Sequence, residues 1–151
     1  MQNRSPNLNV EQQYRLLMVI WFVILFSQAM FLVVIYFSKP EIFKFDVSKP
    51  LLGENPIMVI AFAILAIVNL TISFVMKKRC VEQAIAEQKA QYVQTGLIIA
   101  CALCEVISLL GMVLAFTFSY QYFFLWFALG ISGIILHFPK RDDVIAASYK
   151  R

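Results

Sequence analysis

Four long apolar runs constrain the fold of this chain more than any other feature. The first, at about residues 16–37, contains no charged side chain. At a rise of about 1.5 Å per residue, a helix of that length is about 33 Å long and can cross a hydrocarbon core of about 30 Å. The other runs lie at about residues 57–76, 93–118 and 122–138. A membrane-spanning strand needs only about 9–11 residues of alternating polarity, so these runs predict helices.

The composition places the chain in the membrane class. It is 61% hydrophobic and 15% charged, whereas globular domains are about 45–50% apolar and about 25% charged. The connecting segments, an outer loop at 38–56 and a second loop at 77–91, are too short to fold a soluble domain. We therefore predict an all-α, integral membrane four-helix bundle that forms a single membrane domain over residues 1–151.

The distribution of basic residues predicts the orientation. Of the 13 Lys and Arg residues, only Lys39, Lys44 and Lys49 fall in the outer loop, and the other basic residues flank the opposite ends of the runs. Because Lys and Arg are enriched on the cytoplasmic side, we expect both termini and the 77–91 loop in the cytoplasm. The expected location is the plasma (inner) membrane, as a multi-pass protein.

The two loops and the first run allow further local predictions. The outer loop carries Pro40, Pro50 and Pro56, which predicts an irregular segment with a short extended piece at 42–47. Residues 80–91 contain no Gly or Pro and predict a helical extension of a neighbouring span. Residues 27–29 could also pass for a signal-peptide cleavage site, but the apolar run continues past them and favours an anchor.

Glu105 is the one acidic residue near the middle of an apolar run. A carboxylate at that depth costs roughly 2.5–3.5 kcal/mol, so we expect the carboxyl group to be protonated and hydrogen-bonded. Gln28 lies at nearly the same depth, Ser108 follows one turn later on the same helix, and Asn69 lies closer to the cytoplasmic end. Glu105, Gln28, Ser108 and Asn69 are the candidates for binding a proton or ion.

The sequence around Glu105 also resembles a known family. Residues 102–105 read Ala-Leu-Cys-Glu, and bulky aliphatic and small residues follow as far as residue 116. This segment resembles the carboxylate helix of rotary ATP synthase c subunits, which implies that Glu105 is the ion-carrying carboxylate and that its helix runs outward from a cytoplasmic loop. The rest of the chain does not match; the second span, for example, contains no glycine, whereas the other helix of that family is glycine-rich.

Other chemistry is not indicated. Cys101 and Cys104 have a C-x-x-C spacing, but no other Cys or His lies near their depth, so small core residues are favoured over a metal pair. His137 is expected at the membrane interface. The sequence contains no nucleophile–base pair, phosphate loop or nucleotide motif. We predict no enzymatic activity, no catalytic residue, no cofactor, no metal site and no nucleic-acid partner.

Two functions remain open. The first is a non-catalytic accessory or scaffold subunit of a membrane complex, in which Glu105 joins helices. The second is a proton- or cation-handling membrane protein that uses Glu105 as its carrier. Both predict the lipid bilayer and either other membrane subunits or further copies of this chain as partners. Whether Glu105 titrates distinguishes the two hypotheses.

Overall fold

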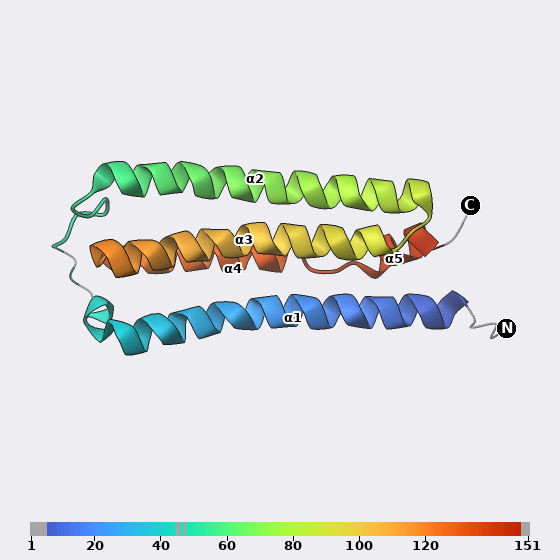
Figure 1. Ribbon diagram of the computed structural model, residues 1–151, viewed down its shortest axis with the longest axis horizontal. Helices are drawn as coiled ribbons and strands as arrows, with labels where there is room; N and C mark the ends of the chain where they lie inside the picture. The colour runs from blue at the N-terminus through green and yellow to red at the C-terminus, as the bar shows by residue number, and fades with distance from the viewer. Residues whose placement is uncertain (1–5, 45, 47, 149–151) are drawn as a thin grey trace.

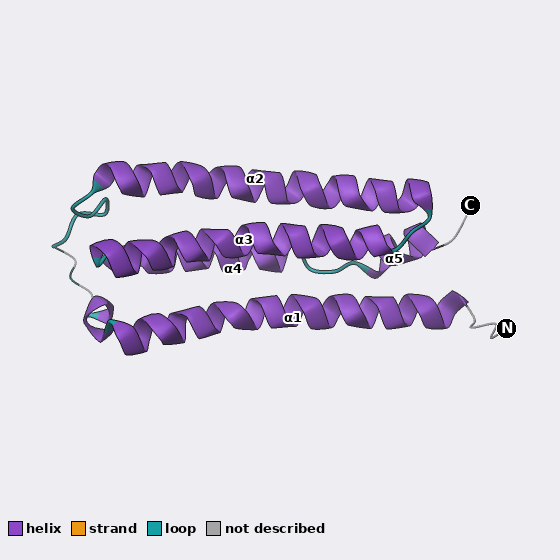
Figure 2. Cartoon of the chain, in the orientation of Figure 1, coloured by secondary structure: helices purple, strands orange, loops and turns teal. Residues whose placement is uncertain are grey.

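The computed structural model describes residues 6–44, 46 and 48–148, and every regular element in these ranges is helical (Figures 1 and 2). This confirms the all-α prediction. The α-helices are α1 (Pro6–Ser38), α2 (Pro56–Glu87), α3 (Gln91–Phe118), α4 (Phe124–Leu136) and α5 (Arg141–Ser148). Two 3-10 turns, η1 (Pro40–Phe43) and η2 (Gln121–Phe123), lie between them.

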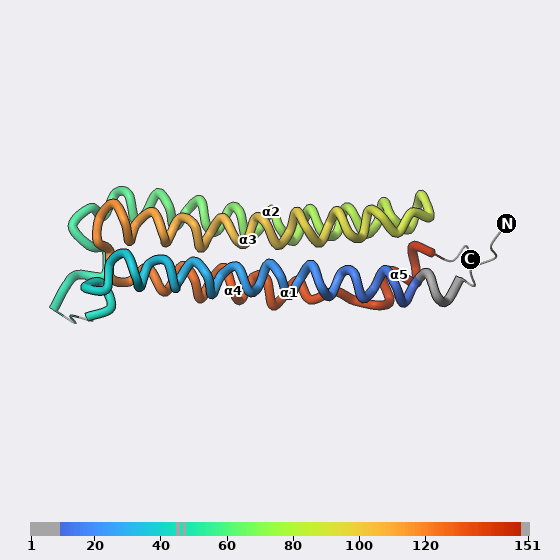
Figure 3. The backbone as a smooth tube through the Cα atoms, turned by 60° about the horizontal axis from the view of Figure 1, so that its bottom comes forward, coloured from blue at the N-terminus to red at the C-terminus, as the bar shows by residue number. Residues whose placement is uncertain are grey.

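Helix α3 occupies the centre of the molecule. Helices α1 and α2 lie along its two opposite flanks, and α4 packs behind it (Figures 1 and 3). The start of α1, the α2–α3 connection and α5 lie at one end of the molecule. The turn η1, residues 48–55 and the α3–α4 turn lie at the other end. Because α3 contacts both flanking helices and α4, its side chains line most of the interior.

Three helices have the length and composition needed to cross a bilayer. They are Val10–Ser38 within α1, Pro56–Glu87 and Gln91–Phe118. The fourth apolar run is helical over a shorter range than 122–138: α4 covers Phe124–Leu136 and is followed by a break before α5. The segment 121–136 and α5 reach the length and apolar character of a span only when they are taken together, and the angle between them is 44°. Pro139 explains the break, since proline cannot continue a helix and restricts the residue before it.

The connections differ in part from their predictions. Residues 40–43 form η1, with Pro40 in its first turn and Ile42 buried, so the expected extended piece at 42–47 is wrong over this part; residues 45 and 47 lie outside the described ranges. The predicted helical extension of a span is confirmed, because α2 continues to Glu87. The αL residue Gln88 then ends the helix.

Helix α1 contacts the rest of the molecule along one narrow stripe. Its buried side chains recur at spacings of seven or four residues and are Val10, Leu17, Trp21, Gln28 and Ile35. This is the spacing of a helix that packs along a single seam. The indole N–H of Trp21 also donates a 2.8 Å hydrogen bond to the carbonyl oxygen of Ile134 in α4. Many of the other described side chains of α1 are apolar and exposed, among them Phe22, Phe26 and Phe37.

Glycine allows α3 and α4 to approach closely. A Cβ atom added at Gly111 of α3 would lie 2.5 Å from the Cβ of Trp126 in α4. A Cβ added at Gly133 of α4 would lie 2.7 Å from the Sγ of Cys104 in α3. Small residues at helix contacts are the usual means of close packing in membranes, where lipid supplies no hydrophobic driving force between helices.

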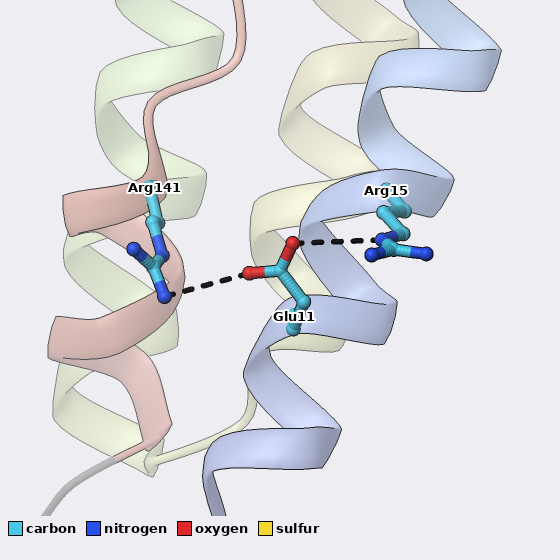
Figure 4. A network of polar contacts seen from close by, with 3 residues as sticks. All are labelled: Glu11, Arg15 and Arg141. Atoms are coloured by element: carbon cyan, nitrogen blue, oxygen red, sulfur yellow. Dashed lines mark hydrogen bonds and ion pairs between the residues drawn. The ribbon is translucent and has the colours of Figure 1, made fainter.

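Charged residues join the two ends of the chain at one end of the molecule. Glu11 of α1 accepts from Arg15 Nε at 3.5 Å and pairs with Nη2 of Arg141 in α5 at 3.4 Å (Figure 4). All three side chains are well exposed, so the pairs add little to stability. Their geometric role is to position α5 beside α1.

Candidate functional site

Glu105 lies at mid-length in α3, on the side toward α1. Its side chain is half-buried, and Oε1 accepts a 2.6 Å hydrogen bond from the hydroxyl of Ser27. The neighbouring outward positions of α3 are apolar and exposed: Ile98, Ala102, Val106, Leu109 and Val113. Glu105 therefore sits at the edge of an apolar face of α3, where it joins that helix to α1.

Hydrogen counting at Ser27 bears on the state of Glu105. The Ser27 hydroxyl also lies 2.7 Å from the carbonyl oxygen of Ile24, in donor geometry. A hydroxyl has one hydrogen, so it cannot donate to both oxygens at once. When the hydrogen points to Ile24, a short contact to Glu105 requires that the Glu105 carboxyl group carry a proton and donate it to Ser27. The site thus accommodates both the charged and the protonated carboxyl group.

Gln28 does not bond directly to Glu105. Its side chain is 1% exposed, and its amide nitrogen lies 3.5 Å from the Ser27 hydroxyl, to which it donates. Its Oε1 is buried without a hydrogen-bond partner among the described residues. Gln28 is thus linked to Glu105 only through Ser27. Consecutive side chains on a helix point in directions about 100° apart. Gln28, at the depth of Glu105, therefore points into the core, and its neighbour Ser27 contacts Glu105.

Ser108 faces a different helix from Glu105. It is fully buried, and a Cβ added at Gly130 of α4 would collide with its Oγ. This oxygen has no hydrogen-bond partner within the described chain. A step of three residues turns the side chain by about 60° around the helix, enough to move it from the α1 side to the α4 side.

Asn69 is not brought to Glu105. It belongs to α2, on the opposite flank of α3 from α1 (Figure 1). Its amide donates a 2.9 Å hydrogen bond to the carbonyl oxygen of Leu65, one turn back on its own helix. Of the four predicted site residues, the structure groups Glu105 with Gln28 through Ser27, and it places Ser108 and Asn69 elsewhere.

A second polar cluster, not predicted from the sequence, joins α2, α3 and the end of α4. Ser73 Oγ lies 2.9 Å from Nε2 of His137, and the Cys104 Sγ lies 3.7 Å from the same Ser73 oxygen. Lys77 Nζ donates to the carbonyl oxygens of His137 and Phe138 at 3.1 and 3.3 Å. His137 is 1% exposed, so its imidazole is buried within the protein rather than open to its surroundings.

The cluster provides hydrogen-bond partners at the C-terminal end of the short helix α4. The last carbonyl groups of a helix lack partners within the helix, and Lys77 supplies donors to two carbonyl oxygens at the end of α4. Ser73 Oγ pairs with Nε2 of the buried imidazole. The sequence signal was weak: Ser73 and Lys77 are one turn apart and His137 lies near the predicted end of its span, but their contact depends on tertiary packing.

The two cysteines of the C-x-x-C motif are both buried and free. Cys104 contacts Ser73 and the Gly133 backbone region, and Cys101 belongs to the same apolar cluster as Trp21 and Leu97. Among the described residues, no group of three or more His, Cys, Asp or Glu side chains is placed to hold a metal ion. Both thiols therefore serve as small core side chains.

Comparison of the chain with protein-family models, with curated proteins and with solved structures finds no match.

Proposed function

We propose that this chain is an integral membrane protein that crosses the bilayer four times, with both termini in the cytoplasm, and that it acts as a non-catalytic accessory or scaffold subunit of a membrane complex. The observation that carries the proposal is the apolar outer surface of the long helices. Phe26 of α1 is 64% exposed, and Ile57 and Ile67 of α2 are 81% and 62% exposed. An apolar surface of this extent needs lipid or partner subunits around it.

The position of Glu105 supports a structural role. Its carboxyl group bonds to a side chain of a neighbouring helix, and such interhelical hydrogen bonds contribute about 0.6 kcal/mol each on average in membrane proteins. The adjoining apolar face of α3, from Ile98 to Val113, lies between α1 and α2 and gives another transmembrane helix a surface to pack on. The hydrogen bond stabilises the chain itself, and the apolar face offers a contact surface to neighbouring subunits; both fit a scaffold subunit.

Membrane placement and orientation can be tested by chemical labelling in cells. In a Cys80→Ala background, Ser48→Cys should react with an impermeant maleimide from outside intact cells. Glu82→Cys should react only after the cytoplasmic face is opened. Extraction of the chain by alkaline carbonate, or labelling of both positions from the same side, would contradict the proposal.

The scaffold role can be tested by native electrophoresis of mildly solubilised membranes. The chain should migrate within a larger assembly, and Glu105→Gln should leave that assembly intact, because glutamine retains a hydrogen-bonding side chain of the same length. A chain that migrates alone and carries protons across liposomes would contradict the scaffold role.

A second function, proton or cation handling by Glu105, is favoured by the partly exposed Glu105 side chain and by the resemblance of residues 102–116 to a c-subunit carboxylate helix. The Ser27 hydroxyl can accept a hydrogen bond from a protonated Glu105 carboxyl group or donate one to the charged carboxylate, as ion exchange requires. Infrared difference spectra across pH, with Glu105→Gln as control, decide between the two functions. A carboxyl band that titrates reversibly favours carriage, and one that never titrates favours the scaffold.

A further inference from the structure

Two cavities abut at the end of the molecule opposite the termini. The loop pocket, of about 510 Å³, lies between the 49–55 segment with the start of α2 and residues 117–122. The flank pocket, of about 280 Å³, lies between α2 and α4. Leu52, Val59 and Tyr120 line both cavities, so one wall is common to the two.

The flank pocket is almost wholly apolar, whereas the lining of the loop pocket mixes polar and apolar side chains. The flank pocket is lined by aliphatic and aromatic side chains, with the small residues Ala63 and Ala66 on the α2 side and Trp126 on the α4 side. The loop pocket carries polar side chains, among them Lys49 and Glu54. A ligand that fills both needs a hydrocarbon chain at one end and a polar group at the other.

The charges of the loop pocket define the polar group. Lys49 and Glu54 are both exposed, and neither forms an ion pair within the described chain. Lys49 acts on Asp46 only through a longer-range Coulomb attraction. One free ammonium group and one free carboxylate complement a headgroup that bears a phosphate and a primary amine, because a lysine binds phosphate and a carboxylate accepts from an amine.

The shared wall is a fixed part of the fold. The Tyr120 hydroxyl donates a 2.7 Å hydrogen bond to the Leu51 carbonyl oxygen. Gly53 has φ +64°, and a Cβ there would lie 3.0 Å from Cδ2 of Tyr120. The turn before α2 is thus held against the aromatic ring. Tyr and Trp are also the side chains that concentrate at the headgroup level of a bilayer.

We propose that the abutting pockets bind one molecule of an aminophospholipid such as phosphatidylethanolamine, with the phosphate at Lys49, the amine at Glu54 and one acyl chain between α2 and α4. The proposal rests on the membrane placement proposed above and adds a specific ligand to it. The site lies in the outer leaflet, because it is formed by the loop opposite the cytoplasmic end.

Native mass spectrometry of the full chain released from detergent micelles tests this directly. Phosphatidylethanolamine, phosphatidylglycerol and phosphatidylcholine are supplied at equal concentration. Phosphatidylethanolamine should be retained about fivefold more than phosphatidylcholine, which cannot donate from its quaternary amine. Equal retention of all three lipids would overturn the proposal.

Matched variants separate the two halves of the site. Lys49→Gln should weaken the binding of both phosphatidylethanolamine and phosphatidylglycerol, whereas Glu54→Gln should weaken the binding of phosphatidylethanolamine only. Lys44→Gln, in the same loop but outside the pocket lining, should change neither. Because these side chains are exposed, the variants should fold, and unchanged lipid binding in Lys49→Gln and Glu54→Gln would overturn the assignment of the headgroup.

The acyl-chain half is tested by filling the flank pocket. Ala63→Leu should abolish retention, and Ala61→Leu, an exposed position on the same helix outside the pocket lining, should not. Equal retention by both variants would overturn the acyl-chain assignment. Binding of inorganic phosphate without retention of any of the three lipids would show a phosphate site only and would overturn the lipid assignment. If the labelling experiment shows membrane insertion but no lipid is selected, this inference fails and the proposed function stands.

Discussion

The hydroxyl of Ser27 lies 2.6 Å from Oε1 of Glu105, which joins α1 to α3 across 78 positions of sequence. The buried side chains of α1 form one narrow stripe, and its other polar contacts across the molecule include the Trp21–Ile134 hydrogen bond and the Glu11–Arg141 ion pair. The Ser27–Glu105 bond adds a polar contact with α3 near the middle of α1. The contact also places the acidic residue of α3 against a hydroxyl that can exchange roles between donor and acceptor. The same pair of atoms, Ser27 Oγ and Glu105 Oε1, therefore joins α1 to α3 and contacts the group whose protonation is in question.

We predict that Ser27→Ala lowers the free energy of unfolding by about 0.6–2 kcal/mol, because it removes the interhelical hydrogen bond to Glu105. The measurement is reversible unfolding in mixed micelles. Ser132→Ala is the matched control: this exposed serine of α4 makes no hydrogen bond in the described chain, so its loss should have little effect. Equal effects of the two substitutions would show that the Ser27–Glu105 contact does not stabilise the fold.

We predict that Lys77→Met destabilises the chain by about 1 kcal/mol, because the carbonyl oxygens of His137 and Phe138 lose their donor at the end of α4. Lys78→Met is the control, since Lys78 is 79% exposed and only reaches Glu82 at 3.9 Å. Thermal unfolding of the purified protein followed by circular dichroism gives both values. A larger loss for Lys78→Met would contradict the role assigned to Lys77.

The depth of the polar residues could be predicted from the sequence, but their direction could not. Counting along the apolar runs placed Gln28 level with Glu105, and the two residues do lie in one polar group. The direct contact comes from Ser27, because the direction of a side chain depends on which neighbours its helix meets. Ser108, predicted as a site residue because it lies one turn from Glu105 on the same helix, instead faces Gly130 of α4.

The three long helices were predictable because the first three apolar runs are much longer than an ordinary strand. The burial of His137 was not predictable, since it depends on contacts between α2 and the end of α4. Ser73 and His137 are 64 residues apart, and neither carries a local signal of the other. Pro139 did mark the end of the fourth run, because proline acts through local geometry.

We predict that Asp46 titrates at a pH below its ordinary pKa of 3.8. The side chain and backbone N–H of Ser48 donate to its carboxylate and are the main causes of the lowered pKa; burial acts in the opposite direction, and Lys49 adds a smaller lowering. A depressed pKa stabilises the folded loop above the unfolded pKa, and this stabilisation is lost as the pH falls through the folded value. Carboxyl ¹³C shifts should show the low midpoint, and Ser48→Ala should raise it. An unchanged midpoint in Ser48→Ala would contradict the assigned cause.

We predict that Gly111→Ala destabilises the chain by about 1–3 kcal/mol, because the added methyl group would lie 2.5 Å from Cβ of Trp126 and 3.1 Å from the Phe123 carbonyl oxygen. Neither neighbour can yield easily, since one is a side-chain root and the other is backbone. Ala102→Leu, a larger change on the exposed face of the same helix, should have a much smaller effect. Unfolding in mixed micelles gives both values, and a Gly111→Ala protein as stable as the wild type would mean that α3 and α4 are not held at this close approach. Loss of tryptophan fluorescence anisotropy at Trp126, measured in a Trp21→Phe background, should accompany the destabilisation, since the same contact holds the indole ring in place.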